Sequence, residues 1–221
     1  MAQWAAGFGN VAQWVGVAAT TVAIIVALFK ESLIRRFRHP ALIVRIEAKE
    51  PYMVRTPLRH KEWRGSRYFI RLSIENFGKV RADKVEVFLS EVLIQQNASY
   101  KPISNFRPIN LRWSYGIYER PDIYADGISP KMGRFCDLAA ITDPTHPDLQ
   151  PLPDTRLALW TEQLSDRTEW LRPGRYKFKV IVAASNSDPK AYWIDLHLTG
   201  LWNDDPITMM SNGVVLSLRE E

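Results

Sequence analysis

The chain of 221 residues is 46% hydrophobic and 24% charged, a composition that is ordinary for a folded protein and excludes a disordered or fibrous chain. Its single cysteine, Cys136, excludes an intrachain disulfide and is consistent with a reducing compartment. Residues 30–81 hold fourteen Lys and Arg against five Asp and Glu, a charge of +9, so the rest of the chain carries −4 of the net +5. We therefore expect no duplex-DNA-binding domain, in which basic residues dominate the whole module.

The N-terminus predicts a membrane anchor. Residues 1–29 contain no charged side chain, and residues 11–29 form a continuous apolar stretch. Nineteen helical residues extend roughly 28 Å, close to the thickness of one hydrocarbon core. We expect a spanning helix within an anchor of residues 1–39. A cleaved signal peptide is the alternative, but no Lys or Arg precedes the stretch and no small-residue cleavage pattern follows it.

Four basic residues follow this stretch at once: Lys30, Arg35, Arg36 and Arg38. Positive charge beside a spanning helix stays in the cytoplasm. We therefore expect a single-pass protein of a bacterial inner membrane, with its N-terminus outside and its C-terminal domain in the cytoplasm. The same residues suit contact with lipid phosphates, although a positive-inside anchor explains them without specific lipid recognition.

Small residues recur on one face of the predicted helix, where Ala12, Gly16 and Thr20 follow each other at intervals of four. Small residues let helices approach closely in lipid, so the spacing indicates self-association through this helix. The alternative is that Ala and Gly are simply common in spanning helices.

Residues 40–221 predict one cytoplasmic β-domain. Residues 67–75 alternate between apolar and polar side chains, as half-buried strands do. Further strands are indicated over residues 41–48, 84–94, 157–160, 177–184, 191–198 and 214–218. Because no helical pattern separates them, we expect a mainly β fold, an antiparallel Ig-like β-sandwich preceded by one transmembrane α-helix.

One long segment interrupts this pattern. Residues 97–153 hold eight of the fourteen prolines and show no sustained period. A connection of this length is unusual in a compact domain. We expect an irregular Pro-rich insertion that is ordered by short elements.

Two stretches resemble known sandwich domains. Residues 68–89, with Ile74-Glu-Asn-Phe-Gly78 and Val85-Glu-Val87, resemble the bacterial Ig-like domains called CARDB-like. Leu171-x-Pro-Gly-x-Tyr176 is similar to the corner strand of fibronectin type III and Ig domains. The resemblance implies that the Tyr176 hydroxyl bonds backbone within residues 170–173. It implies little about function, because such sandwiches have many roles.

The strongest candidate for binding is a basic loop over residues 55–67. It holds five Arg and Lys around one tryptophan, and its candidate ligand residues are Arg55, Arg59, Lys61, Trp63, Arg64 and Arg67. This composition suits phosphate binding and base stacking; a solvated loop is the alternative. A first strand of about nine residues from Pro40 would span about 30 Å. At about four Debye lengths headgroup attraction is screened, so we expect a cytosolic anionic ligand or protein partner.

The sequence carries no recognisable catalytic pattern, neither a P-loop nor a nucleophile elbow nor a Gly-rich dinucleotide turn. A pairing of Cys136 with His146 is a poor candidate, because a lone cysteine among apolar residues is typical of a core. The run from Asp143 to Asp148 is typical of turns. We therefore expect no enzyme, no metal and no cofactor.

Two functions fit these features. The first is a membrane-anchored cytoplasmic binding or interaction module without catalytic activity. The alternative is an oligomeric membrane effector that perturbs the bilayer when its sandwich senses a ligand, for example a nucleotide signal. The small-residue face of the predicted helix supports the alternative.

Overall fold

The computed structural model describes residues 5–37, 39–60, 62–104, 106–114, 124–146, 155–159 and 170–221. The chain divides into two compact units, Met1–His39 and Pro40–Glu221. The first contains helix α1 (Ala5–Phe37). Within it, Gln13–Lys30 is long and apolar enough to cross a membrane.

Polar side chains of α1 are bonded to the helix itself. The hydroxyls of Thr20 and Thr21 donate to the carbonyl oxygens of Gly16 and Val17, each at 2.9 Å. Large apolar side chains, Trp14 and Leu28 among them, are exposed along the helix. Both features suit a segment surrounded by lipid, where polar groups need partners within the helix.

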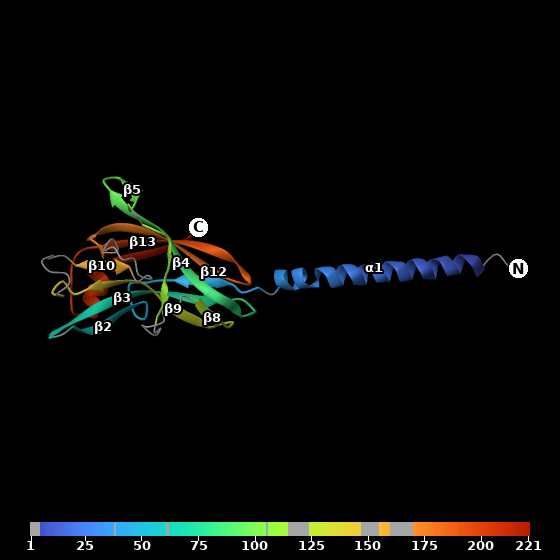
Figure 1. Ribbon diagram of the computed structural model, residues 1–221, viewed down its shortest axis with the longest axis horizontal. Coiled ribbons are helices and arrows are strands. Elements are labelled where there is room, and N and C mark those ends of the chain that lie inside the picture. Colours follow the sequence, from blue (N-terminus) through green and yellow to red (C-terminus); the bar gives the residue numbers. More distant parts are fainter. Residues whose placement is uncertain are drawn as a thin grey trace. The chain divides into compact units, whose positions relative to one another are not determined.

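The second unit is built from two antiparallel sheets (Figure 1). The first contains, in spatial order, β1 (Leu42–Arg45), β3 (Trp63–Asn76), β9 (Gly133–Thr142), β10 (Arg156–Leu159) and β11 (Trp170–Leu171), with β2 (Met53–His60) beside β3 and β7 (Arg112–Trp113) beside β9. The second contains β14 (Val214–Glu220), β13 (Ser187–Leu198), β12 (Gly174–Ala184), β4 (Ala82–Gln96) and β5 (Ser99–Pro102), with β6 (Ile109–Asn110) and β8 (Tyr124–Ile128) beside β4. The predicted mainly β sandwich preceded by one helix is confirmed.

Alternating side chains fill the core between the sheets. On β3, Tyr68, Ile70, Leu72 and Ile74 are each fully buried. On β12, every second residue from Tyr176 to Val182 is buried. This period of two is the signal from which the strands were predicted, and the structure extends most of them by a few residues at their ends.

The expectation of an irregular insertion over residues 97–153 is wrong for Gly133–Thr142. These ten residues form β9, which lies in the middle of its sheet between β3 and β10. All side chains from Cys136 to Thr142 are buried. A strand that is covered on both faces shows a continuous apolar run in place of alternation, so the period-two test does not detect it.

Asn76 connects three segments at one end of the sandwich. Its Oδ1 accepts hydrogen bonds from the N–H groups of Ala41 (3.1 Å) and Gly78 (2.9 Å). Its Nδ2 donates to the carbonyl oxygens of Val80 and Ile128, each at 2.8 Å. The buried amide therefore fixes the entry of the chain into β1 against the β3–β4 turn and β8.

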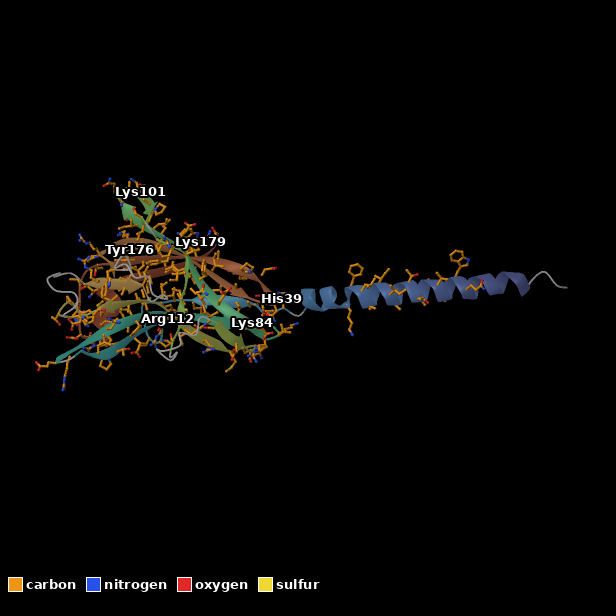
Figure 2. All side chains as sticks on the ribbon, in the orientation of Figure 1. His39, Lys84, Lys101, Arg112, Tyr176 and Lys179 are labelled. Atoms are coloured by element: carbon orange, nitrogen blue, oxygen red, sulfur yellow. The ribbon has the colours of Figure 1, made fainter. Side chains whose placement is uncertain are left out.

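The predicted hydrogen bond from the Tyr176 hydroxyl to the backbone of residues 170–173 is confirmed. The Tyr176 hydroxyl donates to the carbonyl oxygen of Arg172 at 2.7 Å, within the range expected from the sequence. The Tyr176 side chain is labelled in Figure 2 and is 1% exposed. Burial raises the pKa of the Tyr176 hydroxyl.

The connection from β13 to β14 contains a short helix α2 (Pro206–Thr208) followed by a π-helical turn, η3 (Met209–Gly213). Asp205 caps α2, since its carboxylate accepts from the N–H of Thr208 at 2.9 Å. This connection packs near the β2–β3 hairpin, which carries the predicted binding residues.

Candidate functional site

The predicted basic loop is an antiparallel ribbon. β2 pairs with β3 along its whole length, from Met53 opposite Ile70 to His60 opposite Trp63. β3 joins β9 only from Arg67 onward. The carbonyl oxygen of Ser66 also accepts from the N–H of Asp143, at 3.2 Å. Residues 58–60 and 63–65 therefore form a two-stranded ribbon at the end of the sheet, here called the β2–β3 ribbon (Figure 1).

The loop prediction was wrong because β2 is an edge strand with unusual composition. Pro57 lies within it, and arginines occupy positions 55 and 59. Proline is tolerated at a sheet edge, where its missing N–H is not needed, and basic residues protect such edges from pairing. Both features are also typical of loops, so the local sequence does not distinguish the two structures.

Two of the predicted ligand residues hold the fold together. Arg55 Nε donates to Ser66 Oγ at 3.0 Å, and its Nη2 forms an ion pair with the carboxylate of Asp204. Arg67 Nε donates to Thr142 Oγ1 of β9 at 2.9 Å. Arg55 thus joins the hairpin to the β13–β14 connection, and Arg67 joins it to the neighbouring strand.

Tyr68 strengthens the contact with that connection. Its hydroxyl donates to the carbonyl oxygen of Asn203 at 2.9 Å, and its ring meets Trp202 edge-on at 5.2 Å. Burial raises the pKa of Tyr68, and the nearby Arg55 opposes this shift. The base of the β2–β3 ribbon is therefore a packed junction.

The end of the β2–β3 ribbon is different. Arg59 is the register partner of Arg64, so two basic residues lie directly opposite each other. Arg64 is exposed. Like charges at opposed positions destabilise a strand pair, and an anion bound between them removes that cost. Lys61 lies outside the described residues, as do the side chains of Arg59 and Trp63.

The ribbon lies far from the start of the sandwich. Ala41 is hydrogen-bonded to both Asn76 and Phe77 at the C-terminal end of β3, and the turn from β2 leads into the N-terminal end of β3. The 14 residues of β3 span about 40 Å at about 3.3 Å each. The sequence predicts a first strand of about nine residues that reaches this far end. In the structure β1 has only 4 residues, and the long strand β3 covers the distance.

The structure contains a buried polar cluster that was not predicted from the sequence. Asp137 of β9 is paired with Arg71 of β3 at 3.1 Å, and both side chains are 9% exposed. The Ser114 hydroxyl donates to the same carboxylate oxygen at 2.5 Å. Burial raises the pKa of Asp137, while the hydrogen bond from Ser114 and the charge of Arg71 oppose the rise. In the sequence, this cluster is indicated only by an acidic residue, Asp137, within the otherwise apolar run of residues 135–141.

Arg112 of β7 is the register partner of Asp137 on its other side. Its Nε is buried and has no hydrogen-bond partner among the described residues. Figure 2 labels this residue on the first sheet. Arg134 lies over the ring of Trp113 at 5.4 Å. The cluster therefore fixes the short strand β7 against β9, and we assign it a structural role.

Cys136 and Asp143, the residues considered for catalysis or metal binding, have other environments in the structure. Cys136 is fully buried, and burial raises the pKa of its thiol well above the usual value, so the thiolate nucleophile is suppressed. Asp143 caps a turn, because its Oδ1 accepts from the N–H of Thr145 at 2.8 Å. Within the described residues no group of three or more His, Cys, Asp or Glu is arranged to hold a metal ion.

The helix residues predicted to pack lie along α1. A Cβ added at Gly16 meets no atom within 4 Å, and the shallow hollow around it is lined by Gln13, Trp14, Gly16, Val17, Thr20 and Thr21. Lys30 is exposed at the end of the apolar segment, and Arg35 and Arg36 continue the helix. Arg38 and the side chains of Ala12, Arg35 and Arg36 lie outside the described part of the chain.

No protein-family model matches this chain, and a search of curated proteins finds no match.

Proposed function

We propose that this chain is a single-pass protein of a bacterial inner membrane whose cytoplasmic β-sandwich is a non-catalytic binding module. Its ligand is a phosphate-bearing anion, free or carried by a protein partner, bound at the end of the β2–β3 ribbon. The observation that carries this proposal is the register of β2 and β3, in which Arg59 lies opposite Arg64.

The cost of that arrangement supports an anionic ligand. Like charges opposite each other on a β-ladder lower stability, and a bound anion between them offsets this cost. Arginine binds phosphate oxygens through paired N–H groups, so two arginines in register offer several charge-assisted hydrogen bonds. Arg55 and Arg67, by contrast, bond groups of the sandwich itself.

The ribbon and the start of the sandwich lie at opposite ends of β3, about 40 Å apart along the strand. A ligand at the ribbon would therefore be bound at the end of the domain away from the segment at which the chain enters it. The uncharged N-terminal side of the apolar helix and the basic residues after it support the cytoplasmic location of the sandwich.

Polyphosphate binding tests the proposal. The full chain in phosphatidylcholine nanodiscs should bind inorganic polyphosphate, and the double variant Arg59→Glu/Arg64→Glu should bind it at least about tenfold more weakly, because two charge-assisted contacts become repulsive. The matched control is Lys79→Glu/Lys101→Glu, which changes net charge equally at two exposed positions. It should lower affinity by less than about threefold.

Equal loss of binding in both double variants would show a diffuse charge effect and overturn the assignment to the ribbon. Nanodiscs that contain phosphatidylglycerol separate the two sources of phosphate. If the ribbon bound headgroups, the wild-type chain would lose polyphosphate binding in these discs, and the Arg59→Glu/Arg64→Glu variant would show no such dependence on lipid.

A second candidate is the membrane effector, favoured by the hollow at Gly16 on α1. If helices associate there, single cysteines introduced at Ala12, Gly16 or Thr20 should crosslink copies into dimers or rings in native membranes. Growth arrest on overexpression of the anchor with its basic flank would favour this function. Monomers throughout would favour the tethered binding module.

A further inference from the structure

The last strand of the second sheet has a long free edge. β14 pairs with β13 along one side and with no other strand among the described residues. Its first five residues, 214–218, contain no charge, proline or glycine. Such an edge presents unpaired backbone groups to any extended chain of matching length.

The other edge strands lack this character. β1 and β5 have 4 residues each, and β11 has 2. β2 is longer, but Pro57 and two arginines interrupt it. These are the usual means by which proteins prevent pairing between sheet edges. With 7 residues and an apolar first half, β14 is the exception among the described edges.

The alternation of hydrogen bonds shows which backbone groups are free. The N–H of Glu221 donates to the carbonyl oxygen of Ala191, and the N–H of Thr199 donates to that of Gly213, each at 3.1 Å. In an antiparallel pair every second residue makes these bonds. The odd-numbered residues of β14 therefore bond β13, and Val214, Leu216, Leu218 and Glu220 present their N–H and C=O groups outward.

We propose that β14 pairs with β14 of a second copy, in antiparallel orientation about a two-fold axis at Ser217. In this register Leu216 lies opposite Leu218 of the second copy, and the outward groups of both strands meet. Val215, which is 55% exposed, lies opposite Arg219 of the second copy, and Val214 opposite Glu220. The two sheets become one continuous sheet.

Charge selects this arrangement and a second copy as its occupant. The charges of the segment are confined to its end, at Arg219, Glu220 and Glu221. Antiparallel pairing about Ser217 places the charged positions of β14 against uncharged residues. A parallel in-register pair would place Arg219 opposite Arg219 and Glu220 opposite Glu220, both of which are destabilising. The strand is thus complementary to itself in one orientation.

Cysteine crosslinking of the full chain in native membranes tests the register. Ser217 would form a pair without hydrogen bonds, whose Cα atoms lie about 4.5 Å apart, within the range that a disulfide spans. Ser217→Cys should give a disulfide-linked dimer on mild oxidation. Val215→Cys and Arg219→Cys should each give at least about fivefold less dimer alone, because four residues offset each pair by about 13 Å. Co-expression of these two variants should restore it.

A charge pair at one exposed position provides the matched control. In the Ser217→Cys background, Val215→Lys places a positive charge opposite Arg219 of the second copy and should lower crosslinking about fivefold. Val215→Glu places a negative charge there and should retain or raise it. Both substitutions change the same exposed site, so an effect on folding alone would lower crosslinking in both.

Three results would overturn the proposal: no dimer with Ser217→Cys, equal dimer with all three single cysteines, or a crosslink from Ser217→Cys to a different protein. If copies associated through α1 alone, β14 would not be aligned with β14 of the second copy. The experiment would then give either no dimer with Ser217→Cys or equal dimer with all three single cysteines. The proposal is independent of the β2–β3 ribbon, so failure of polyphosphate binding leaves it standing.

Discussion

At the scale of single residues, the hydroxyl of Tyr176 is the clearest case of one atom that stabilises the sandwich. Tyr176→Phe keeps the buried ring and leaves the carbonyl oxygen of Arg172 without its 2.7 Å partner. We expect a loss of about 1–2 kcal/mol in the free energy of unfolding, measured with urea. Arg175→Met, at an exposed neighbouring position, should change it by less than about 0.5 kcal/mol.

Lys177, the other neighbour of Tyr176, is unsuitable as a control, because its Nζ lies 3.7 Å from the Asp195 carboxylate and 4.4 Å from the ring of Tyr100. Equal effects of Tyr176→Phe and Arg175→Met would contradict the role assigned to the hydroxyl.

The buried carboxyl group of Asp137 makes the stability of the fold depend on pH. Because burial raises the pKa of Asp137, the folded chain binds this proton more tightly than the unfolded chain does. Stability should therefore fall as pH rises from the ordinary Asp value through the raised one. Ser114→Ala removes a hydrogen bond that favours the charged form. It should raise the pKa of Asp137 further, as followed by carbon NMR of the carboxyl group.

Ser217→Ala, at an exposed position on β14, is the control for this titration and should leave the pKa of Asp137 unchanged. A pKa of Asp137 below the ordinary value in the wild-type chain would mean that the pairing with Arg71 outweighs burial, and would contradict the assignment.

At the scale of elements, β3 joins two environments. From Arg67 onward it lies between β9 on one side and β2 or β1 on the other, whereas residues 63–65 pair with β2 and with no other strand that the structure describes. A strand bonded on both sides and packed on the core opens only with the whole domain, while a two-stranded end opens locally.

Hydrogen exchange should therefore differ within this one strand. We expect amides of residues 69–74 to exchange at least about a hundredfold more slowly than those of residues 63–65, measured by mass spectrometry of overlapping peptides. Residues 178–182 of β12, which pair with both β4 and β13, serve as the slow reference. Uniform protection along β3 would show that the ribbon is held by further contacts.

Element prediction from the sequence succeeded where one face of a strand is buried. The alternation of Tyr68, Ile70, Leu72 and Ile74 was sufficient to place β3, and the same pattern placed β12 and β13. It failed for β9, which is covered on both faces, and for β2, whose proline and arginines are typical of loops as well as of sheet edges. In both cases neighbouring strands, and not local pattern, decide the structure.

At the scale of the whole molecule, the predicted topology depends on the charge asymmetry around the apolar helix. A reporter fused after Glu221 should show cytoplasmic activity, because the basic residues Lys30, Arg35, Arg36 and Arg38 favour the cytoplasmic side of the membrane. Periplasmic alkaline phosphatase activity from the same fusion would reverse the topology. Substitution of the four basic residues by Gln should reduce the bias, and substitution of Lys79 and Lys101 should not.

The amino-acid sequence was sufficient for the features that depend on neighbours along the chain. These include the apolar helix with its basic flank, the alternating strands, and the corner at Tyr176, whose bond spans four residues. The tertiary structure decided the features that depend on distant pairing: β9 in the middle of a sheet, Arg71 with Asp137, and the free edge of β14. Local propensity and period act over a few residues, whereas tertiary contacts join residues as far as 150 positions apart, such as Tyr192, whose hydroxyl donates to the carbonyl oxygen of Leu42 in the other sheet.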